Sequence, residues 1–279
     1  MEIHHYTKAA TLPLILASRK IRFTRADFLD DKTEVPFRDS RLDPRFYFVS
    51  SWSAAQIEQA GQWIQYGDQG KGVRITLRHS PFDLTSLNVE VSRPIAFGRR
   101  VGLQIKDVLA PFCEGMMFGN GYLLMPDGAG THDSFGSEVI YDPNPALWAA
   151  RFVTSTVNET TISGQSTCIA RVKSDVWADQ REFRYVLMAA KGPKLGYANS
   201  PDVYKNALLD QFETDGVNGR ANAPTEATSI DLPFSPTCLE HLAVTFGPKI
   251  SAEDRQSIST ALAKHAPHAV VRESTVALR

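Results

Sequence analysis

At positions 180–188 the chain reads Gln180-Arg181-Glu182-Phe183-Arg184-Tyr185-Val186-Leu187-Met188, polar residues followed at once by an apolar run. The apolar run predicts a buried strand from Glu182 to Ala190. In an extended backbone the side chains at i and i+2 point the same way. The pattern therefore predicts that the amide of Gln180 and the carboxylate of Glu182 converge at the mouth of this strand. Such a pair can hold a sugar hydroxyl and stabilise positive charge that develops on the sugar.

Two simpler interpretations compete with a site at this position. Glu182 and Arg184 could form a solvated strand edge, and Gln180 could be ordinary surface polarity. A charge at the start of a buried strand is energetically unfavourable unless it contacts a ligand or pairs with an opposite charge. This favours a functional site over a solvated edge. We expect its partners in two distant segments, His5-Tyr6-Thr7 and Ser51-Trp52-Ser53.

The composition indicates a globular protein. The 279 residues are 43% hydrophobic and 22% charged, with a net charge of -1, so no global field attracts nucleic acid or an acidic membrane. Three scattered cysteines argue against a disulfide framework or a zinc site, and no metal is expected. The N-terminus lacks a signal peptide, and no apolar run reaches membrane-spanning length. We therefore expect a cytoplasmic protein without a membrane partner.

Hydrophobic periodicity predicts one α+β domain over residues 1–279. Strands are expected at 3–6, 20–24, 46–53, 73–77, 87–91, 93–97, 182–190, 229–232, 242–246 and 269–271. Helices are expected at 12–18, from Ser53 onward, at 145–157 and at 251–265. Two elaborated loops are expected, a lid-like one near 115–136 and a surface excursion at 193–228. The acidic segment containing Asp30, Asp31 and Glu34 is expected to be a solvated loop.

Several motifs together resemble an uncharacterised bacterial family that is catalogued as a domain of unknown function (DUF). The family's pattern has an N-terminal HYT, an SWS strand end and a late W-x-x-(E/Q)-x-E-(W/F)-R. Here these are His5-Tyr6-Thr7, Ser51-Trp52-Ser53 and Trp177 to Arg184. The resemblance covers nearly the whole chain, but the family name carries no function.

The same three segments resemble, more distantly, the NAD-binding motifs of ADP-ribosyltransferases. In those enzymes an Arg or His, a serine or tyrosine motif, and a glutamate in (E/Q)-x-E follow one another along the chain. His5, Ser51-Trp52-Ser53 and Gln180-Arg181-Glu182 stand in that order, although Trp52 replaces the usual threonine. The resemblance implies a split, strand-rich core with peripheral helices, and NAD as a substrate.

The resemblance also implies a role for each candidate residue. Glu182 would stabilise an oxocarbenium-like ribose, as carboxylates do in glycoside cleavage, and Gln180 would orient the acceptor. The residues that would contact NAD or support the site are His5, Thr7, Ser51, Trp52, Ser53 and Tyr66. Five of them have a structural alternative: His5 as a half-buried histidine, Thr7 as a turn hydroxyl, Ser53 as a helix N-cap, and Trp52 and Tyr66 as core or edge aromatics.

The function expected from this resemblance is transfer of ADP-ribose to a macromolecular acceptor, which could be protein, RNA or DNA. A toxin or phage-defence role fits the wider superfamily. Alternatives are an NAD glycohydrolase or a nuclease that uses the same cleft, or a non-catalytic module that binds a nucleotide or a partner. Serine-hydrolase, zincin and Rossmann fingerprints do not occur in the sequence. The acceptor and the oligomeric state stay open.

Overall fold

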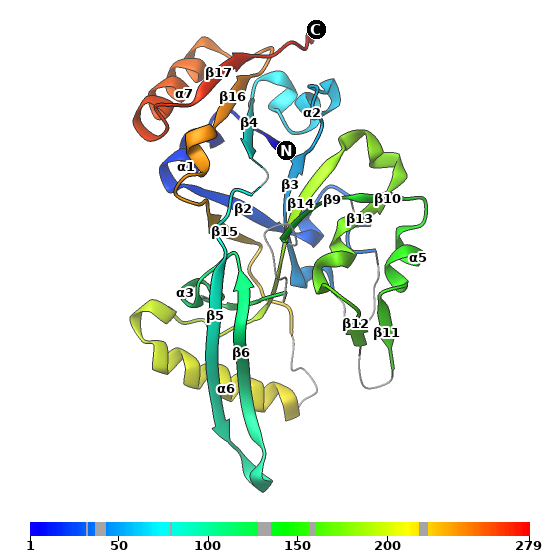
Figure 1. Ribbon diagram of the computed structural model, residues 1–279, viewed down its shortest axis with the longest axis vertical. Helices are drawn as coiled ribbons and strands as arrows, with labels where there is room; N and C mark the ends of the chain where they lie inside the picture. Colours follow the sequence, from blue (N-terminus) through cyan, green and yellow to red (C-terminus); the bar gives the residue numbers. More distant parts are fainter. Residues whose placement is uncertain (32, 37–42, 79, 128–134, 157–159, 218–222) are drawn as a thin grey trace.

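Helix and strand contribute almost equally to the fold, at 33% and 36% of the residues, and most strand pairs are antiparallel (Figure 1). The computed structural model describes residues 1–31, 33–36, 43–78, 80–127, 135–156, 160–217 and 223–279. The strands are β1 Glu2–Thr7, β2 Lys20–Arg25, β3 Tyr47–Ser53, β4 Val73–Arg78, β5 Thr85–Pro94, β6 Arg100–Ala110, β7 Phe118–Gly119, β8 Tyr122–Met125, β9 Gly136–Glu138, β10 Ile140–Asp142, β11 Val153–Ser155, β12 Thr160–Ile162, β13 Val172–Ser174, β14 Glu182–Lys191, β15 Ser229–Pro233, β16 Ala243–Phe246 and β17 Val270–Glu273.

Helices lie around the edges of these strands (Figure 1). The α-helices are α1 Thr11–Ser18, α2 Ala60–Gln65, α3 Glu114–Met117, α5 Pro145–Ala150, α6 Pro201–Val217 and α7 Ala252–His265. The 3-10 turns are η1 Ala26–Phe28, η2 Pro44–Phe46, η3 Asp68–Gly70, η4 Ala96–Gly98, η5 Ser166–Arg171, η6 Asp175–Gln180, η7 Tyr197–Asn199 and η8 Cys238–His241. Among the described residues, no helix is both long enough and apolar enough to cross a membrane.

The largest sheet follows the order β17-β16-β4-β1-β3-β14-β8-β7, with β15-β2 joined to β3 and β9 joined to β14. β1 pairs with β4 along its whole length but meets β3 only where His4 faces Ser53. β3 in turn pairs with β14 from Ser53 to Tyr47. The two halves of the sheet therefore diverge beyond His4 and Ser53, and space opens between β1 and β3.

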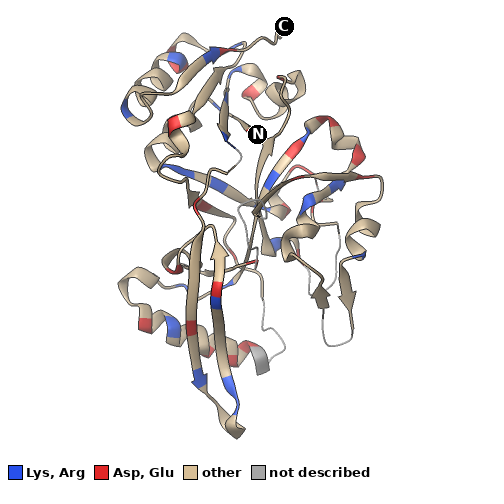
Figure 2. Ribbon diagram, in the orientation of Figure 1, with Lys and Arg blue, Asp and Glu red and all other residues tan. Residues whose placement is uncertain are grey.

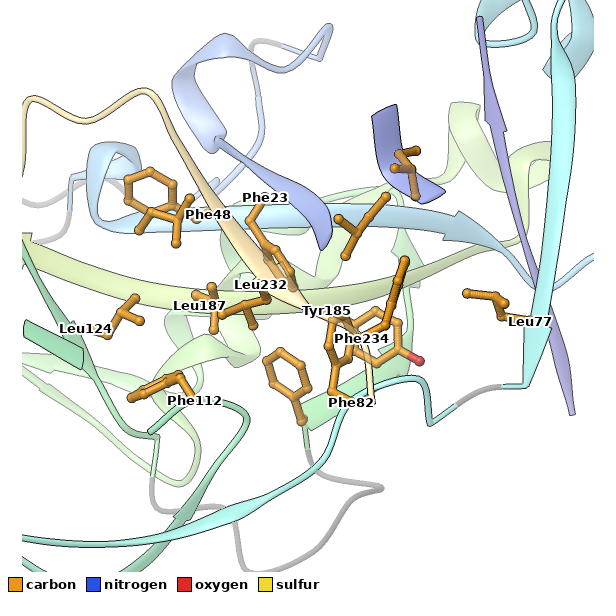
Figure 3. Packing of buried hydrophobic residues seen from close by; sticks show 14 of the residues in the cluster. Phe23, Phe48, Leu77, Phe82, Phe112, Leu124, Tyr185, Leu187, Leu232 and Phe234 are labelled. Carbon is orange, nitrogen blue, oxygen red and sulfur yellow. The ribbon is translucent and has the colours of Figure 1, made fainter. Parts of the chain in front are cut away.

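β14 is the central strand, and its alternate residues enter different cores. Phe183, Tyr185, Leu187 and Ala189 belong to the larger cluster, which α1, α6 and α7 help to cover. Figure 3 shows Tyr185 packed among Phe23, Phe82 and Phe234 from other strands and loops. Val186 and Ala190 belong to a smaller cluster on the opposite face. Glu182 and Arg184 lie on that second face, so their charges are surrounded by protein.

The expected helix after Ser53 is wrong in position. Ser53 ends β3, and α2 begins only at Ala60, because residues 54–59 form an irregular connection. Ile57 is 79% exposed and Ile64 is 52% exposed, so neither packs on the core. Trp63 and Gln62 are the buried residues of α2.

The two expected loop elaborations are also wrong in large part. Segment 115–136 supplies β7 and β8 to the main sheet, and its last residue begins β9; β8 and β9 both pair with β14. Its residues 128–134 lie outside the described part. Segment 193–228 contains α6, which buries Tyr204, Leu208 and Leu209, while residues 218–222 lie outside the described part. The expected strand at 87–91 lies within β5, which pairs with β6 in a long projecting hairpin (Figure 1). The expected strand at 93–97 is wrong beyond Pro94, where β5 ends and η4 follows.

Candidate functional site

A cavity of about 250 Å³ opens where β1 and β3 diverge. β1, β3 and β14 contribute to its walls, together with α2, η6 and the loop after β2. Of the residues singled out from the sequence, it is lined by His5, Ser51, Trp52, Ser53, Tyr66, Gln180 and Glu182. Thr7 is not among the lining residues. It ends β1 half-buried, and its carbonyl oxygen lies against Gly72.

Gln180 and Glu182 converge by a different geometry from the one expected. Gln180 ends the 3-10 turn η6, and Arg181 adopts the left-handed region at φ 44° and ψ 53°. β14 begins only at Glu182, so residues 180–182 are not one extended strand. Both side chains nevertheless reach Lys173, whose Nζ donates to Gln180 Oε1 at 3.0 Å and to Glu182 Oε2 at 3.3 Å.

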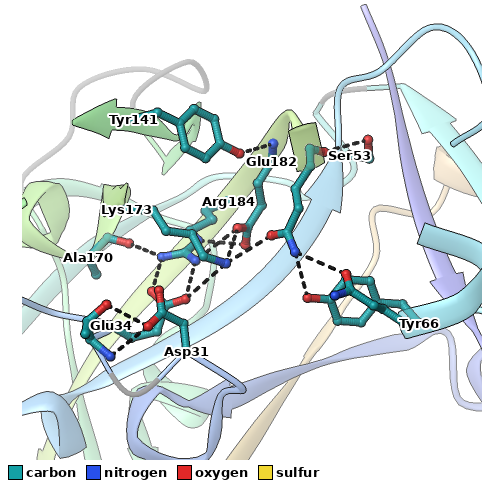
Figure 4. Close-up of polar contacts among 12 residues, drawn as sticks. Asp31, Glu34, Ser53, Tyr66, Tyr141, Ala170, Lys173, Glu182 and Arg184 are labelled. Carbon is teal, nitrogen blue, oxygen red and sulfur yellow. Dashed lines mark hydrogen bonds and ion pairs between the residues drawn. The ribbon is translucent and has the colours of Figure 1, made fainter. Parts of the chain in front are cut away.

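A buried ionic network surrounds the Glu182 carboxylate (Figure 4). Arg184 donates to Glu182 through Nε at 2.7 Å and Nη2 at 3.0 Å, and to Glu34 through Nη1 at 2.6 Å and Nη2 at 2.7 Å. Lys173 also lies 3.5 Å from Glu34. The four side chains are between 1% and 7% exposed, so this is not a solvated strand edge.

The network keeps Glu182 ionised. Burial alone would raise the pKa of its carboxyl, but the charge and hydrogen bonds of Arg184, with Lys173 and the Ser51 hydroxyl, lower that pKa to about 2. The backbone N–H of Glu182 donates to the Tyr141 hydroxyl at 2.8 Å, which fixes the start of β14. An ionised carboxylate held in place can stabilise a developing cation but cannot act as a general acid near neutral pH.

Gln180 is held by both ends of its amide. Its Nε2 donates to Tyr66 Oη at 3.2 Å and to Gln65 Oε1 at 3.3 Å, while its Oε1 accepts from Lys173 (Figure 4). The Ser53 hydroxyl donates to the Gln180 carbonyl oxygen at 3.2 Å and accepts from the Ala55 N–H. The Ser53 hydroxyl therefore links η6 to the end of β3 by hydrogen bonds and does not cap a helix.

His5 lies in the gap between the diverging strands. Its Nδ1 donates to the Ser51 carbonyl oxygen at 3.0 Å, because a carbonyl can only accept, and this leaves Nε2 as an acceptor in the neutral ring. Burial lowers the pKa of His5 below its usual value, and the bond to Ser51 only partly opposes that shift. The His5 ring lies 5.1 Å from the ring of Trp52, which is buried and donates to Ser50 Oγ.

Sequence reasoning missed four contributors to the site. Asp31 and Glu34 are 8% and 4% exposed, which corrects the expected solvated loop, whereas Asp30 is exposed. Lys173 carried no local signal, because only the fold brings β13 to the cavity. The ring centroid of Trp177 lies 4.7 Å from Lys173 Nζ. Trp177 begins the W-x-x-Q-x-E segment, so it is the one of these four residues that a sequence motif contains.

The cavity is acidic although the whole chain is nearly neutral. Figure 2 shows acidic and basic residues interspersed along the ribbon. Four carboxylates line the cavity, from Asp30, Asp31, Glu34 and Glu182, whereas its basic lining residues are Lys173 and Arg22. Arg22 is engaged by Asp231 at 2.9 Å. Asp31 Oδ2 is buried without a hydrogen-bond partner in the described part of the chain. Glu34 and Glu182 are paired with Arg184 and Lys173, so the unmatched negative charge comes from Asp30 and Asp31. This charge favours a ligand with a positive charge and hydroxyl donors.

Comparison with known proteins supplies no family for this chain. No protein-family model, curated protein or solved structure matches it. Within the described residues, no group of three or more His, Cys, Asp or Glu side chains is arranged to hold a metal ion.

Proposed function

We propose that the cavity binds the nicotinamide riboside end of NAD and that the protein transfers ADP-ribose from it to a macromolecular acceptor. The supporting observation is the convergence of Glu182, Gln180, His5 and Ser51 on one acidic cavity, from segments far apart in the sequence. The nicotinamide ring of NAD is a cation, which matches the surplus of carboxylates. The residues of the ADP-ribosyltransferase resemblance, apart from Thr7, therefore share one site.

The size of the cavity limits which part of NAD it holds. Pockets that enclose a drug-sized ligand span about 300–1,000 Å³, whereas this cavity is about 250 Å³. It accommodates a nucleoside-sized group, and the rest of NAD extends outward. Trp177 and Tyr66 offer half-buried rings for stacking. The unpartnered Asp31 Oδ2 accepts a hydrogen bond from a ribose hydroxyl.

In the proposed reaction the bond between nicotinamide and the ribose anomeric carbon breaks, and its electron pair leaves with the ring, which becomes neutral. The ionised Glu182 stabilises the positive charge that develops on the ribose. A nucleophile of the acceptor, oriented by Gln180, bonds to the anomeric carbon and releases its proton to solvent. Transfer to water instead of the acceptor gives the hydrolytic alternative.

One observation favours a second candidate, a module that binds NAD or another nucleotide without turnover. Both Glu182 oxygens accept hydrogen bonds from Arg184, and Lys173 approaches Oε2. These cations offset the carboxylate charge that would stabilise the ribose cation. Binding without release of nicotinamide would distinguish this candidate from the transferase.

The test measures how fast nicotinamide is released from NAD in the presence of separate protein, RNA and DNA pools. The NAD carries a label in its adenosine half, so the label shows where the ADP-ribose goes. Glu182→Gln should lower release by about 10²–10³. Asp127→Asn is the matched control, because Asp127 accepts hydrogen bonds from Ser166 and Thr167 outside the cavity and receives the same change of carboxylate to amide. Label in an acceptor pool indicates transfer, and free ADP-ribose indicates hydrolysis. Wild-type release by Glu182→Gln would reject catalysis by this site.

A further inference from the structure

A second polar cavity lies on the half of the sheet that β4, β16 and β17 form. Arg74 in β4 faces Thr245 in β16, and Thr245 faces Arg272 in β17. Residues directly opposite one another on neighbouring strands point to the same face of the sheet. Two guanidinium groups and the hydroxyl between them therefore stand in one row across three strands.

This row lines a cavity of about 330 Å³, whose other walls include Gln56, Glu58 and Thr275. The cavity shares no lining residue with the cavity at Glu182. It is thus a separate feature of the fold, and the proposed NAD chemistry does not use it.

Arg74 is a buried cation whose charge is balanced only in part, by Glu58 in the lining of the same cavity. Arg74 is 6% exposed, and its Nη2 lies 3.4 Å from Thr245 Oγ1. Its side chain also interacts with the hydroxyl of Tyr6, the residue that faces it on β1. Nε and Nη1 have no hydrogen-bond partner in the described part of the chain. No ion pair of Arg74 occurs there either. Burying a guanidinium in this way is unfavourable, and an oxyanion between Arg74 and Arg272 would remove the penalty.

The two carboxylates beside the cavity are engaged by other donors. Glu58 accepts from Trp63 Nε1 at 2.9 Å, from Ser274 Oγ at 2.5 Å and from the backbone and hydroxyl of Thr275. Glu273 is paired with Arg255 on α7. Glu58 keeps its charge, so it offsets one of the two guanidinium groups. The remaining charge suits a ligand group that carries one negative charge.

We propose that this cavity binds a phosphate group, in the singly charged state of a phosphodiester. Guanidinium forks match the spacing of oxyanion oxygens, and arginines on separate strands with a hydroxyl between them approach from different directions. A phosphodiester offers two charged oxygens and two ester oxygens at the corners of a tetrahedron, whereas a carboxylate offers two oxygens in one plane. The phosphate belongs to a nucleotide, to nucleic acid or to free orthophosphate.

The experiment is an NMR titration of the arginine Nε–H signals of the full chain, at low ionic strength. Dimethyl phosphate, inorganic phosphate and acetate are the probes, each at up to tens of millimolar. Dimethyl phosphate should shift the Arg74 signal in a saturable way and bind more tightly than acetate. Arg272→Gln, followed on the Arg74 signal, and Arg74→Gln, followed on the Arg272 signal, should each weaken binding by about tenfold or more, because each removes a hydrogen bond to a charged group. Arg272 is exposed, so its variant keeps the fold.

Arg78→Gln is the matched control, since Arg78 is exposed and lies on the same strand outside this cavity. It should bind dimethyl phosphate like the wild type. Tighter binding of inorganic phosphate than of the diester would still support a phosphate site and would identify free phosphate as the source. No saturable shift with either phosphate probe, tighter binding of acetate, or unchanged binding by Arg272→Gln would overturn the proposal.

Discussion

The pair between Arg184 and Glu34 allows the energetic weight of the buried network to be measured with one substitution. Two Arg184 nitrogens donate to Glu34 at 2.6 and 2.7 Å, and the side chains are 1% and 3% exposed. Each hydrogen bond to a charged group contributes about 1.5–3 kcal/mol. Glu34→Gln keeps one acceptor oxygen but turns an NH₂ group toward the other guanidinium nitrogen. We expect the free energy of unfolding to fall by about 3 kcal/mol, near the lower end for breaking a buried pair.

Urea unfolding, followed by tryptophan fluorescence and circular dichroism, measures this loss. The control is Asp231→Asn, which breaks a pair with Arg22 of the same bidentate kind, at 2.9 and 3.1 Å. The side chains of that pair are 65% and 40% exposed, so its loss should cost less than about 1 kcal/mol. Equal losses in the two variants would refute the reasoning, because they would show that the Arg184–Glu34 pair is energetically no different from a solvated one.

Three further predictions follow from the pKa shifts and from one close backbone contact. The pKa of Glu182 is lowered from 4.5 to about 2, so its stabilisation should be complete above about pH 5 and be lost as the pH falls toward 2. Acid unfolding of Glu182→Gln should lack that part of the pH dependence, and equal acid curves would contradict it. Because burial lowers the pKa of His5 below 6.5, its ring should be mainly neutral at pH 7 and above, with the proton on Nδ1, which ¹⁵N NMR of the ring reports; a proton on Nε2 alone would exclude the bond to Ser51. Gly72→Ala would place a Cβ 2.1 Å from the Thr7 carbonyl oxygen, so we expect the melting temperature to fall by about 5 °C, and an unchanged value would show that β1 and β4 adjust freely.

Local patterns predicted β1 to β5 and β14 to β17, and they missed β6 to β13 and most of the connections. The aromatic run of β3 and the apolar run of β14 indicate buried strands, and both strands lie where they were expected. The segment that contains α6 was misjudged as a surface excursion because its composition is polar. A signal was present, however: Tyr204, Leu208 and Phe212 recur every four residues after Pro201, as in a helix with one buried side. β8 and β9 had no such signal, because long-range pairing with β14 defines them.

The candidate site shows the same division. The order of the His5, Ser51 and Glu182 motifs was enough to select residues that line one cavity. The period-two argument for Gln180 failed, because the left-handed conformation of Arg181 interrupts the strand. The burial of Glu34 depends on its pairing with Arg184, which lies 150 residues away in the sequence. The local sequence around Glu34 shows only an acidic loop, and such a loop is expected to be solvated. Pairwise partners of this kind cannot be read from local sequence, since only the closed fold determines them.

The single residue pair that joins β1 to β3 has a consequence for hydrogen exchange. β1, β4 and β16 are linked to one another by continuous ladders, and so are β3 and β14, but His4 and Ser53 alone connect the two groups through the backbone. We expect the amides of each group to exchange as a separate cooperative unit with its own opening free energy. A ligand in the cavity between β1 and β3 would touch both units, so it should slow exchange in strands far from its own contacts and merge the two openings into one.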